Sequence, residues 1–451
     1  MKRILNILFL FLFLGGSAQN RIIDSLQAVL KTAKEDTTKV KILNNLSWRL
    51  RNKKIDTSLI LSSEAITLSK KLQWKKGIGV SLAQIGIFYR YIGNYDSSEI
   101  ILLRGVKFNR EINNKTAVSS CLGGLANLNM DQGNYTEALS YNLEGIKIDE
   151  EIGNKASLAT KLGNIGIIYK ETKNVTEAYN YFLRALKINK ELNETKGIGL
   201  NLVNIGNVFK TRGNYDTALI YYNESYKLHE KIGDKTGIAQ ILGNIAIVYY
   251  LIGDSLMISG KSASLYNIYF TKAVEHSRMY FEMSKELHNE KMMVVAKMNI
   301  ASALIKLGKF KEGEQTFIDA LTFAKKAGFI NNEMEIHRNL SEIYIKKNPK
   351  LALEHYKSFI IFRDSIFNEE NTKKTTRLEM NYEFDKKEAA AKLEREKKEA
   401  LTIAESKKQK VIIWSVCGIL FLVICFSLFA YKNFLQKKEN KYCHIKTKRN
   451  Y

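Results

Sequence analysis

An asparagine recurs at one position of a repeated pattern, and its side chain is suited to hydrogen-bonding an extended chain. The recurring residues are Asn164, Asn204, Asn244, Asn299 and Asn339, with Asn44 in phase at the start. An amide side chain offers one donor and one acceptor type, which match the two polar groups of a peptide backbone. The same amides would equally well bond to the neighbouring repeat and only hold a stack together. Both interpretations stay open at this stage.

Four further polar residues fall near this series and extend the predicted binding face. They are Asn127, Asn207, Lys170 and Lys210. The amides would add hydrogen bonds, and the lysines would add positive charge toward a ligand. The two sets together are suited to bind a protein or peptide ligand.

Patterns typical of catalysis or metal binding are weak. SGKS at 259–262 resembles the end of a phosphate-binding loop, but that pattern needs glycine where Ser255 stands, and no strand is expected before it. The six histidines show neither a four-residue spacing nor a Glu-x-x-His pattern. No Gly-x-Ser-x-Gly motif occurs. We therefore expect no catalytic residue, no metal site and no cofactor, and we do not expect an enzyme.

The asparagines belong to a repeat with a period of 40 residues. LAQIG at 82–86 returns as LGGLA at 122–126, LGNIG at 162–166, LVNIG at 202–206 and LGNIA at 242–246. GNY at 93–95, 133–135 and 213–215 keeps the same period, with KNV at 173–175. A fixed period of this length is typical of stacked structural repeats.

Each unit is predicted to be a hairpin of two amphipathic helices. The apolar stripe of the first helix is formed by Leu162, Ile165, Gly166 and Tyr169. Lys173 and Asn174 mark the turn, and Thr176 is a candidate N-cap of the second helix. Because one hairpin cannot bury its apolar faces alone, the copies are expected to stack into a right-handed superhelix.

These residues resemble the tetratricopeptide repeat (TPR). The first helix carries a small residue and an aromatic ring at Gly86 and Tyr89, at Gly166 and Tyr169, and at Gly206 and Phe209. The second helix carries Ala178, Phe182 and Ala185 in one copy, and Ala218 and Tyr222 in the next. The 40-residue period is similar to the longer repeats of kinesin light chain and LGN-type adaptors. The resemblance implies an all-α TPR superhelical solenoid whose concave groove binds proteins.

The array is expected over residues 82–367, after a degenerate helical repeat or cap at 19–81. KMNIASALIKLGKF at 297–310 matches LGNIAIVYYLIGD displaced by 55 residues instead of 40, which predicts an insertion near 256–270. Pro349 is placed to begin a last second helix, where a missing N–H costs nothing.

Both ends of the chain carry membrane-related patterns. Residues 1–18 have Lys2 and Arg3, an apolar run and a small-residue cleavage site, as in a secretory signal peptide. Residues 411–431 contain no charge and are long enough for one transmembrane helix, which a short basic tail follows at 432–451. These patterns predict a single-pass protein of the bacterial inner membrane, with its bulk in the periplasm and its tail in the cytoplasm.

Residues 368–410 contain no Gly or Pro and are rich in Ala, Glu and Lys, which predicts a long charged helix. Two interpretations remain open: a coiled coil that makes a homodimer, or a single stalk with ion pairs along it. The formal charge of +24 is spread over lysines along the helices, so it indicates a solvated face and no nucleic-acid partner.

The order of these segments resembles a class of bacterial membrane receptors, in which a kinase, phosphatase or DNA-binding output domain follows the span. Two functions are therefore considered. The first is a membrane-anchored scaffold or sensor that captures a peptide or protein in its periplasmic groove. The alternative is a truncated or split receptor whose output domain is missing or lies on a separate cytoplasmic signalling partner. A structural assembly factor of the envelope is a third class.

Overall fold

The computed structural model describes residues 14–364, with side chains from Arg21 onward, and in the C-terminal part residues 397, 408–409, 420, 424, 426–433 and 437. The chain divides into two compact units, 1–380 and 381–451. The expected signal peptide, the charged helix at 368–410, the span at 411–431 and the tail at 432–451 lie largely outside the described residues. The fold below is that of the first unit.

The described part of this unit is built from helices alone, as the sequence predicts. A leading helix, α2 (Leu14–Thr32), precedes a series of two-helix hairpins. The hairpins are α3 (Thr37–Leu50) with α4 (Ile55–Lys71), α5 (Lys75–Tyr91) with α6 (Tyr95–Glu111), α7 (Lys115–Asp131) with α8 (Tyr135–Glu151), α9 (Lys155–Glu171) with α10 (Val175–Glu191), α11 (Thr195–Thr211) with α12 (Tyr215–Lys231), α13 (Lys235–Ile258) with α14 (Ala263–Glu286), α15 (Glu290–Lys306) with α16 (Phe310–Ala327), and α17 (Ile330–Tyr344) with a helix at 349–364. Pro349 is the first residue of that last helix.

The repeated GNY triplet is the turn inside a hairpin. Gly93 ends α5 in the left-handed conformation, with φ at 76°, where glycine carries no steric cost. Asn94 then caps α6, because its side chain accepts from the backbone N–H of Ser97 at 3.1 Å. In the KNV copy the same cap is made by Asn174, so the expected cap at Thr176 is corrected by two residues. Thr176 lies inside α10 because Asn174 already satisfies the first turn.

Within a hairpin, a small residue of the first helix receives a large side chain of the second. A Cβ atom added at Gly166 would lie 2.5 Å from Cε1 of Phe182, and one at Gly206 would lie 2.6 Å from Cε1 of Tyr222. Gly86 meets Leu102 in the same way. The residues singled out from the sequence are buried at Gly86, Gly166, Tyr169, Ala178, Phe182, Ala185, Gly206, Ala218 and Tyr222, and half-buried at Tyr89 and Phe209.

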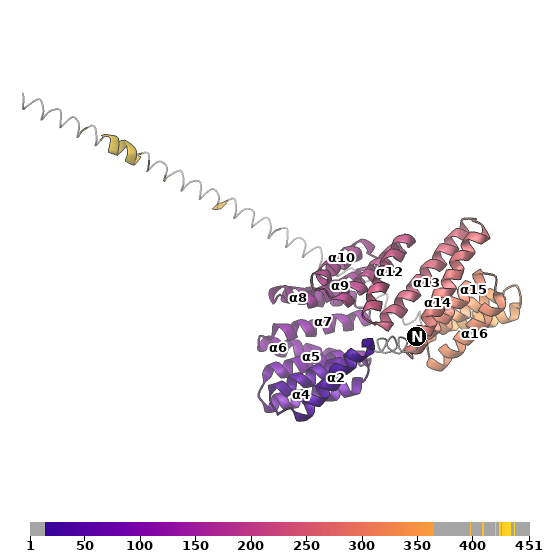
Figure 1. Cartoon of the computed structure of the whole chain (residues 1–451), viewed down its shortest axis with the longest axis horizontal. Helices are drawn as coiled ribbons and strands as arrows, with labels where there is room; N and C mark the ends of the chain where they lie inside the picture. Colours follow the sequence, from indigo (N-terminus) through magenta and orange to yellow (C-terminus); the bar gives the residue numbers. More distant parts are fainter. Residues whose placement is uncertain are drawn as a thin grey trace, which may run out of the picture. The chain divides into compact units, whose positions relative to one another are not determined.

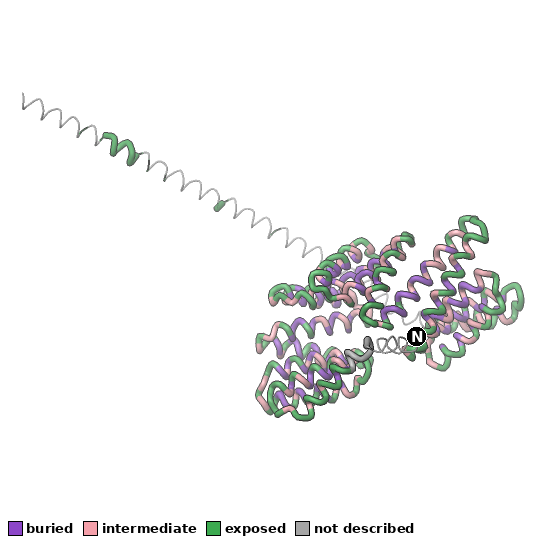
Figure 2. The backbone as a smooth tube through the Cα atoms, viewed as in Figure 1, coloured by how far each residue is buried: buried purple, intermediate pink, exposed green. Residues whose placement is uncertain are grey.

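Consecutive hairpins stack with their first helices toward one another (Figure 1). Each first helix from α3 to α15 contacts the first helix of the next hairpin, whereas consecutive second helices make no comparable contact in the described part. Helices that approach more closely lie on the inside of a curved stack. The first helices therefore line the inner side of the array, and buried residues follow their packed faces in Figure 2.

A buried polar side chain sits at six of the seven joints between hairpins, and the sequence analysis did not find it; the last joint has Ala324 at this position. The residues are Ser69, Asn109, Asp149, Asn189 and His229, spaced by 40, and then Ser284. Asn109 shows the role of this position, because its side-chain amide donates to the Gly79 carbonyl on the preceding first helix at 3.1 Å and to Gly105 of its own helix at 2.8 Å. Polar bonds of this kind tie a second helix to a first helix across the apolar core.

The extra residues near 256–270 lengthen both helices of one hairpin. Helices α13 and α14 have 24 residues each, whereas α9 to α12 have 17. The added turns leave Ile258 80% exposed at the tip. Among the described residues, α13 alone is long and apolar enough to cross a membrane by length and composition. Such a composition also fits a core helix, and α13 packs against α12 and α14 within the array.

We predict that Gly166→Ala destabilises the array by about 1–3 kcal/mol, because the added methyl group would overlap the ring of Phe182. Gly163→Ala is the matched control: its Cβ would have no neighbour nearer than 3.9 Å. That control should stabilise by about 0.5–1 kcal/mol through helix propensity. Thermal unfolding of both variants measures the difference. Equal melting temperatures would contradict a close contact between Gly166 and Phe182.

Candidate functional site

The predicted binding residues lie on first helices and are half-buried. Asn127 is on α7, Asn164 and Lys170 on α9, Asn204, Asn207 and Lys210 on α11, Asn244 on α13, Asn299 on α15 and Asn339 on α17. We call the surface formed by Asn127, Gly163, Asn164, Lys170, Asn204, Lys210 and Asn244 the inner face. It runs over four consecutive first helices, which makes it continuous along the stack.

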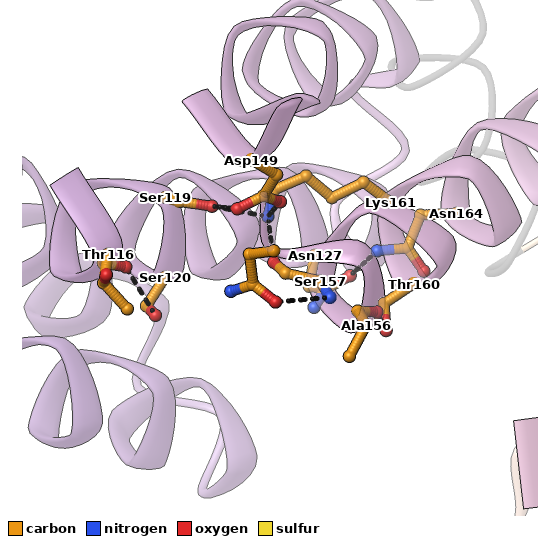
Figure 3. A network of polar contacts seen from close by, with 11 residues as sticks. Thr116, Ser119, Ser120, Asn127, Asp149, Ala156, Ser157, Thr160, Lys161 and Asn164 are labelled. Atoms are coloured by element: carbon orange, nitrogen blue, oxygen red, sulfur yellow. Dashed lines mark hydrogen bonds and ion pairs between the residues drawn. The ribbon is translucent and has the colours of Figure 1, made fainter. Parts of the chain in front are cut away.

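Two hydrogen bonds on the inner face join neighbouring hairpins. The Asn164 side chain donates from Nδ2 to Oδ1 of Asn127 at 2.9 Å, which joins α9 to α7 (Figure 3). Lys210 Nζ lies 3.5 Å from Oδ1 of Asn244, which joins α11 to α13 through a long, weak bond. Stack-holding contacts therefore exist at these positions, and each amide still has hydrogen-bonding capacity left.

The other predicted amides are used differently. Asn207 accepts a hydrogen bond from the hydroxyl of Tyr222 at 2.7 Å within its own hairpin. Asn339 donates to the Glu335 carbonyl at 2.7 Å within α17. The Nδ2 atom of Asn299 is buried and has no hydrogen-bond partner among residues 21–364. The side chain of Asn204 is half-buried and also has no hydrogen-bond partner in that range. Asn204 is thus an open amide in the centre of the inner face.

In the last turn of the first helices, a positive charge is paired with a carboxylate of the next hairpin at α5, before the inner face, but among the described residues not at α9 or α11 within it. Arg90 of α5 is paired with Asp131 of α7 at 2.7 Å. Asp131 lies 41 positions after Arg90 in the sequence. The residues 41 positions after Lys170 and Lys210 are Thr211 and Leu251, and neither carries a charge. Among residues 21–364, Lys170 has one ion-pair partner, the adjacent Glu171 at 2.9 Å. Within residues 21–364, Lys210 has no carboxylate within ion-pair distance.

The surroundings of Lys210 disfavour its charge. Burial lowers the pKa of this ammonium group below its ordinary value, and the positive charge of Lys170 lowers it further. Both causes act in the same direction because no carboxylate opposes them. An anionic group placed beside Lys170 and Lys210 would therefore relieve an existing repulsion.

Two glycines on these first helices are half-buried and have no close neighbour at the Cβ position. A Cβ atom added at Gly163 of α9 would meet nothing nearer than Asn201 Oδ1 at 3.9 Å, and one at Gly123 of α7 nothing nearer than Lys161 at 3.9 Å. Packing does not require glycine at either position, although glycine weakens a helix interior. Each position would therefore accept a methyl group in ordinary contact with its neighbour.

A buried ion pair lies near Asn127 and Asn164 of the inner face (Figure 3). The sequence analysis did not predict it. Lys161 Nζ of α9 donates to Asp149 Oδ2 at 2.8 Å, to Ser119 Oγ at 2.8 Å and to Ser157 Oγ at 2.7 Å. The Ser119 hydroxyl donates to Asp149 Oδ1 at 2.5 Å. All three ammonium protons are used, and the network joins α7, α8 and α9. Its only sequence signal is that Asp149 falls on the 40-residue series of joint residues.

Burial lowers the pKa of Lys161, while the hydrogen bond and the charge of Asp149 oppose that effect. Lys161 is 3% exposed and Asp149 is fully covered. Gly145 makes room for the lysine stem, because an added Cβ there would collide with it. The pair is therefore enclosed and serves the packing of three helices.

A second surface feature lies away from the inner face. An open hollow of about 720 Å³ is lined by residues of the first hairpin and the loop before it, including Lys39, Ile60 and the ion pair of Glu35 with Lys71. It contains none of the predicted binding residues. Among the described residues, no group of three or more His, Cys, Asp or Glu side chains is placed to hold a metal ion.

Comparison with known families agrees with the repeat assignment in the middle of the chain. Residues 157–231 and 197–256 match the tetratricopeptide repeat family model. Residues 157–256 are therefore tetratricopeptide repeats, and the hairpins on either side have the same two-helix form. No curated protein matches the chain in sequence.

Solved structures show the same fold. A Signal Transduction ATPase with Numerous Domains protein with a tetratricopeptide repeat sensor, from Pyrococcus horikoshii, has a TM-score of 0.57 at 15% identity; the match covers 77% of this chain and 51% of that one. Aspartyl phosphate phosphatase F from Bacillus subtilis has a TM-score of 0.50 at 13% identity, over 77% and 94% of the two chains. A Rap protein complexed with Competence and Sporulation Factor has a TM-score of 0.50 at 13% identity, over 81% and 99%.

This chain thus spans about half the length of the Pyrococcus structure. At 13–15% identity the likeness concerns the fold alone.

We predict that Lys161→Met destabilises the array by about 3–5 kcal/mol, because it leaves the Asp149 carboxylate buried without its partner. The double variant Lys161→Met with Asp149→Leu removes both charges and should recover most of that loss. Urea unfolding of the single and double variants measures the coupling. Additive losses would show that the pair does not act as a unit.

Proposed function

We propose that the array captures a peptide or protein segment on its inner face, and that the segment presents a carboxylate to Lys170 and Lys210. The observation that carries this proposal is the unbalanced charge: Arg90 has a carboxylate from the next hairpin, and Lys170 and Lys210 have none there. A ligand carboxylate would complete the pattern. Charge-assisted hydrogen bonds of this type are the strong ones in peptide recognition.

The asparagine side chains with unused hydrogen-bonding groups also support capture of a peptide on the inner face. Asn204 has unused donor and acceptor groups, and Asn164 and Asn244 keep part of theirs. These three amides follow one another on consecutive first helices, so an extended chain crossing α9, α11 and α13 would meet them in turn. At Gly163, beside Asn164, an added Cβ atom would have no neighbour nearer than 3.9 Å.

Related folds offer a precedent for binding. One solved structure with this fold holds Competence and Sporulation Factor, and another carries its repeats as a sensor. Their low identity transfers no ligand to this chain. They support the general role of a protein-binding scaffold, and the charge pattern supports the choice of ligand.

We further propose that the scaffold is anchored in a bacterial inner membrane with the array in the periplasm. The charge-free segment 411–431 and the signal-peptide pattern of residues 1–18 support this topology. In the alternative, the chain is the sensory part of a split or truncated receptor. The resemblance of the segment order to membrane receptors supports that alternative, and ligand capture is common to both.

Binding to degenerate peptide pools tests the ligand class. We expect an acidic pool to bind the full-length protein and a basic pool of equal length not to bind. Lys210→Met should weaken acidic-pool binding about tenfold, because it removes one charge-assisted contact. The control Lys187→Met removes an exposed lysine of α10 and should change binding by less than about twofold. Equal binding of both pools would refute the proposal that Lys170 and Lys210 bind a carboxylate of the ligand.

The double variant Asn204→Ala with Asn244→Ala separates capture from stacking. If these amides hold a ligand, acidic-pool binding should fall about tenfold while the melting temperature stays within a few degrees. Fluorescence anisotropy and thermal unfolding on the same samples give both values. Unchanged capture with a lowered melting temperature would mean that the amides serve only the stack.

A further inference from the structure

Two histidines face each other in the last hairpin. His337 of α17 and His355 of the helix at 349–364 have their Nδ1 atoms 2.8 Å apart, and their ring centroids are 5.0 Å apart. His337 is 5% exposed. Tyr344 stacks on His355 with a centroid distance of 5.6 Å and an interplanar angle of 11°. The ring of Phe362 lies 5.9 Å from that of His337.

This contact depends on protonation. A nitrogen–nitrogen hydrogen bond needs an N–H on one ring and a lone pair on the other, so the pair is held with one shared proton. When both rings are protonated, each Nδ1 carries a hydrogen and each ring a positive charge at the same contact. The hydrogen bond is then lost and the two charges repel.

The neighbouring charges do not rescue the doubly protonated state. Lys325 of α16 adds to the positive charge near both rings. Glu314 of α16 is engaged by the Tyr344 hydroxyl at 2.6 Å and by Lys347 of the turn at 3.5 Å. On the histidines' own helices, Glu354 adjoins His355 and opposes the effect of Lys325, and Glu333 is buried one turn before His337.

The helix at 349–364 packs on the hairpin along one side and leaves several apolar side chains exposed. Ala352 is buried in the core formed with α16 and α17, and Leu351 packs against that core. Leu353, Tyr356 and Ile361 are 52%, 49% and 68% exposed. The histidine pair is therefore one of the contacts that attach this helix to α17, and its loss would weaken that attachment.

We propose that His337 and His355 form an acid-sensitive latch that holds the helix at 349–364 against α17 and releases it when both rings are protonated. In sequence, that helix leads directly to the segment 368–410, so the latch is placed to alter how the array is joined to the rest of the chain. The latch itself does not depend on ligand capture. Its role in signalling rests on the proposed function.

The lowered pKa values of the two histidines determine how the stability of the hairpin changes with pH. Burial, the charge of His355 and that of Lys325 lower the pKa of His337 from 6.5 to about 4, and burial with Lys325 lowers that of His355. The folded hairpin therefore favours neutral rings. Its stabilisation by the pair is complete above pH 6.5 and is lost as the pH falls through about 4.

Hydrogen exchange of the full-length protein in detergent micelles, corrected for intrinsic rates at each pH, tests the latch. Between about pH 7 and pH 4, protection of residues 349–364 should fall about tenfold while α9 to α12 keep theirs. His355→Phe keeps a ring stacked on Tyr344 but removes the hydrogen bond between the two rings and one of the two charges, so its loss of protection between the two pH values should be clearly smaller than that of the wild type. The control His276→Phe should behave as the wild type.

Equal protection of the wild type at both pH values would overturn the proposal, as would an equal loss in His355→Phe or a loss spread over the whole array. If His355→Phe already lacks protection at pH 7, His337→Phe decides the case by the same criterion, because its ring keeps the contact with Phe362. Peptide-pool binding in the same samples distinguishes failure of the latch from failure of ligand capture.

Discussion

The close contact between a small residue of one helix and a large side chain of the next determines the rest of this structure. Gly166 against Phe182 and Gly206 against Tyr222 bring the two helices of a hairpin together, and the left-handed turn residue and Asn cap fix their length. One such hairpin leaves apolar surface uncovered, so each must pack on the next. The first helices approach one another in that stack, and those of their residues that are not packed in the core form one continuous inner face.

This arrangement separates the residues that build the array from those that give it a surface. The core and joints take up the apolar stripes and the buried polar series, including the enclosed Lys161–Asp149 pair. Residues on the inner face are only partly used by the stack, so their charge pattern can serve another purpose. Lys170 and Lys210 stand where no carboxylate of the next hairpin meets them, at a cost in charge repulsion that the stack itself does not require.

Much of the fold could be predicted from the sequence, because a 40-residue period records a packing constraint directly. The helix pairs, the Gly–Asn turn and the buried positions such as Ala178 and Phe182 all follow from it. The cap at Asn174 was misplaced by two residues, because Thr176 is an equally good cap by type. The joint residues share the period but differ in type from Ser69 to His229, so no single motif marks them. Side-chain partners such as Asp131 for Arg90 join different hairpins, and only the stacked structure brings them together.

The most direct test of the central claim is photo-crosslinking from the inner face in cells. A benzophenone amino acid at Gly163, where an added Cβ atom would have no neighbour nearer than 3.9 Å, is compared with one at Ile220, an exposed position on the second helix α12. The account predicts a discrete crosslinked partner from position 163 that disappears when Lys210→Glu is added, and none from position 220. The same crosslinks from both positions, or a partner at 163 that is insensitive to Lys210→Glu, would contradict capture on the inner face.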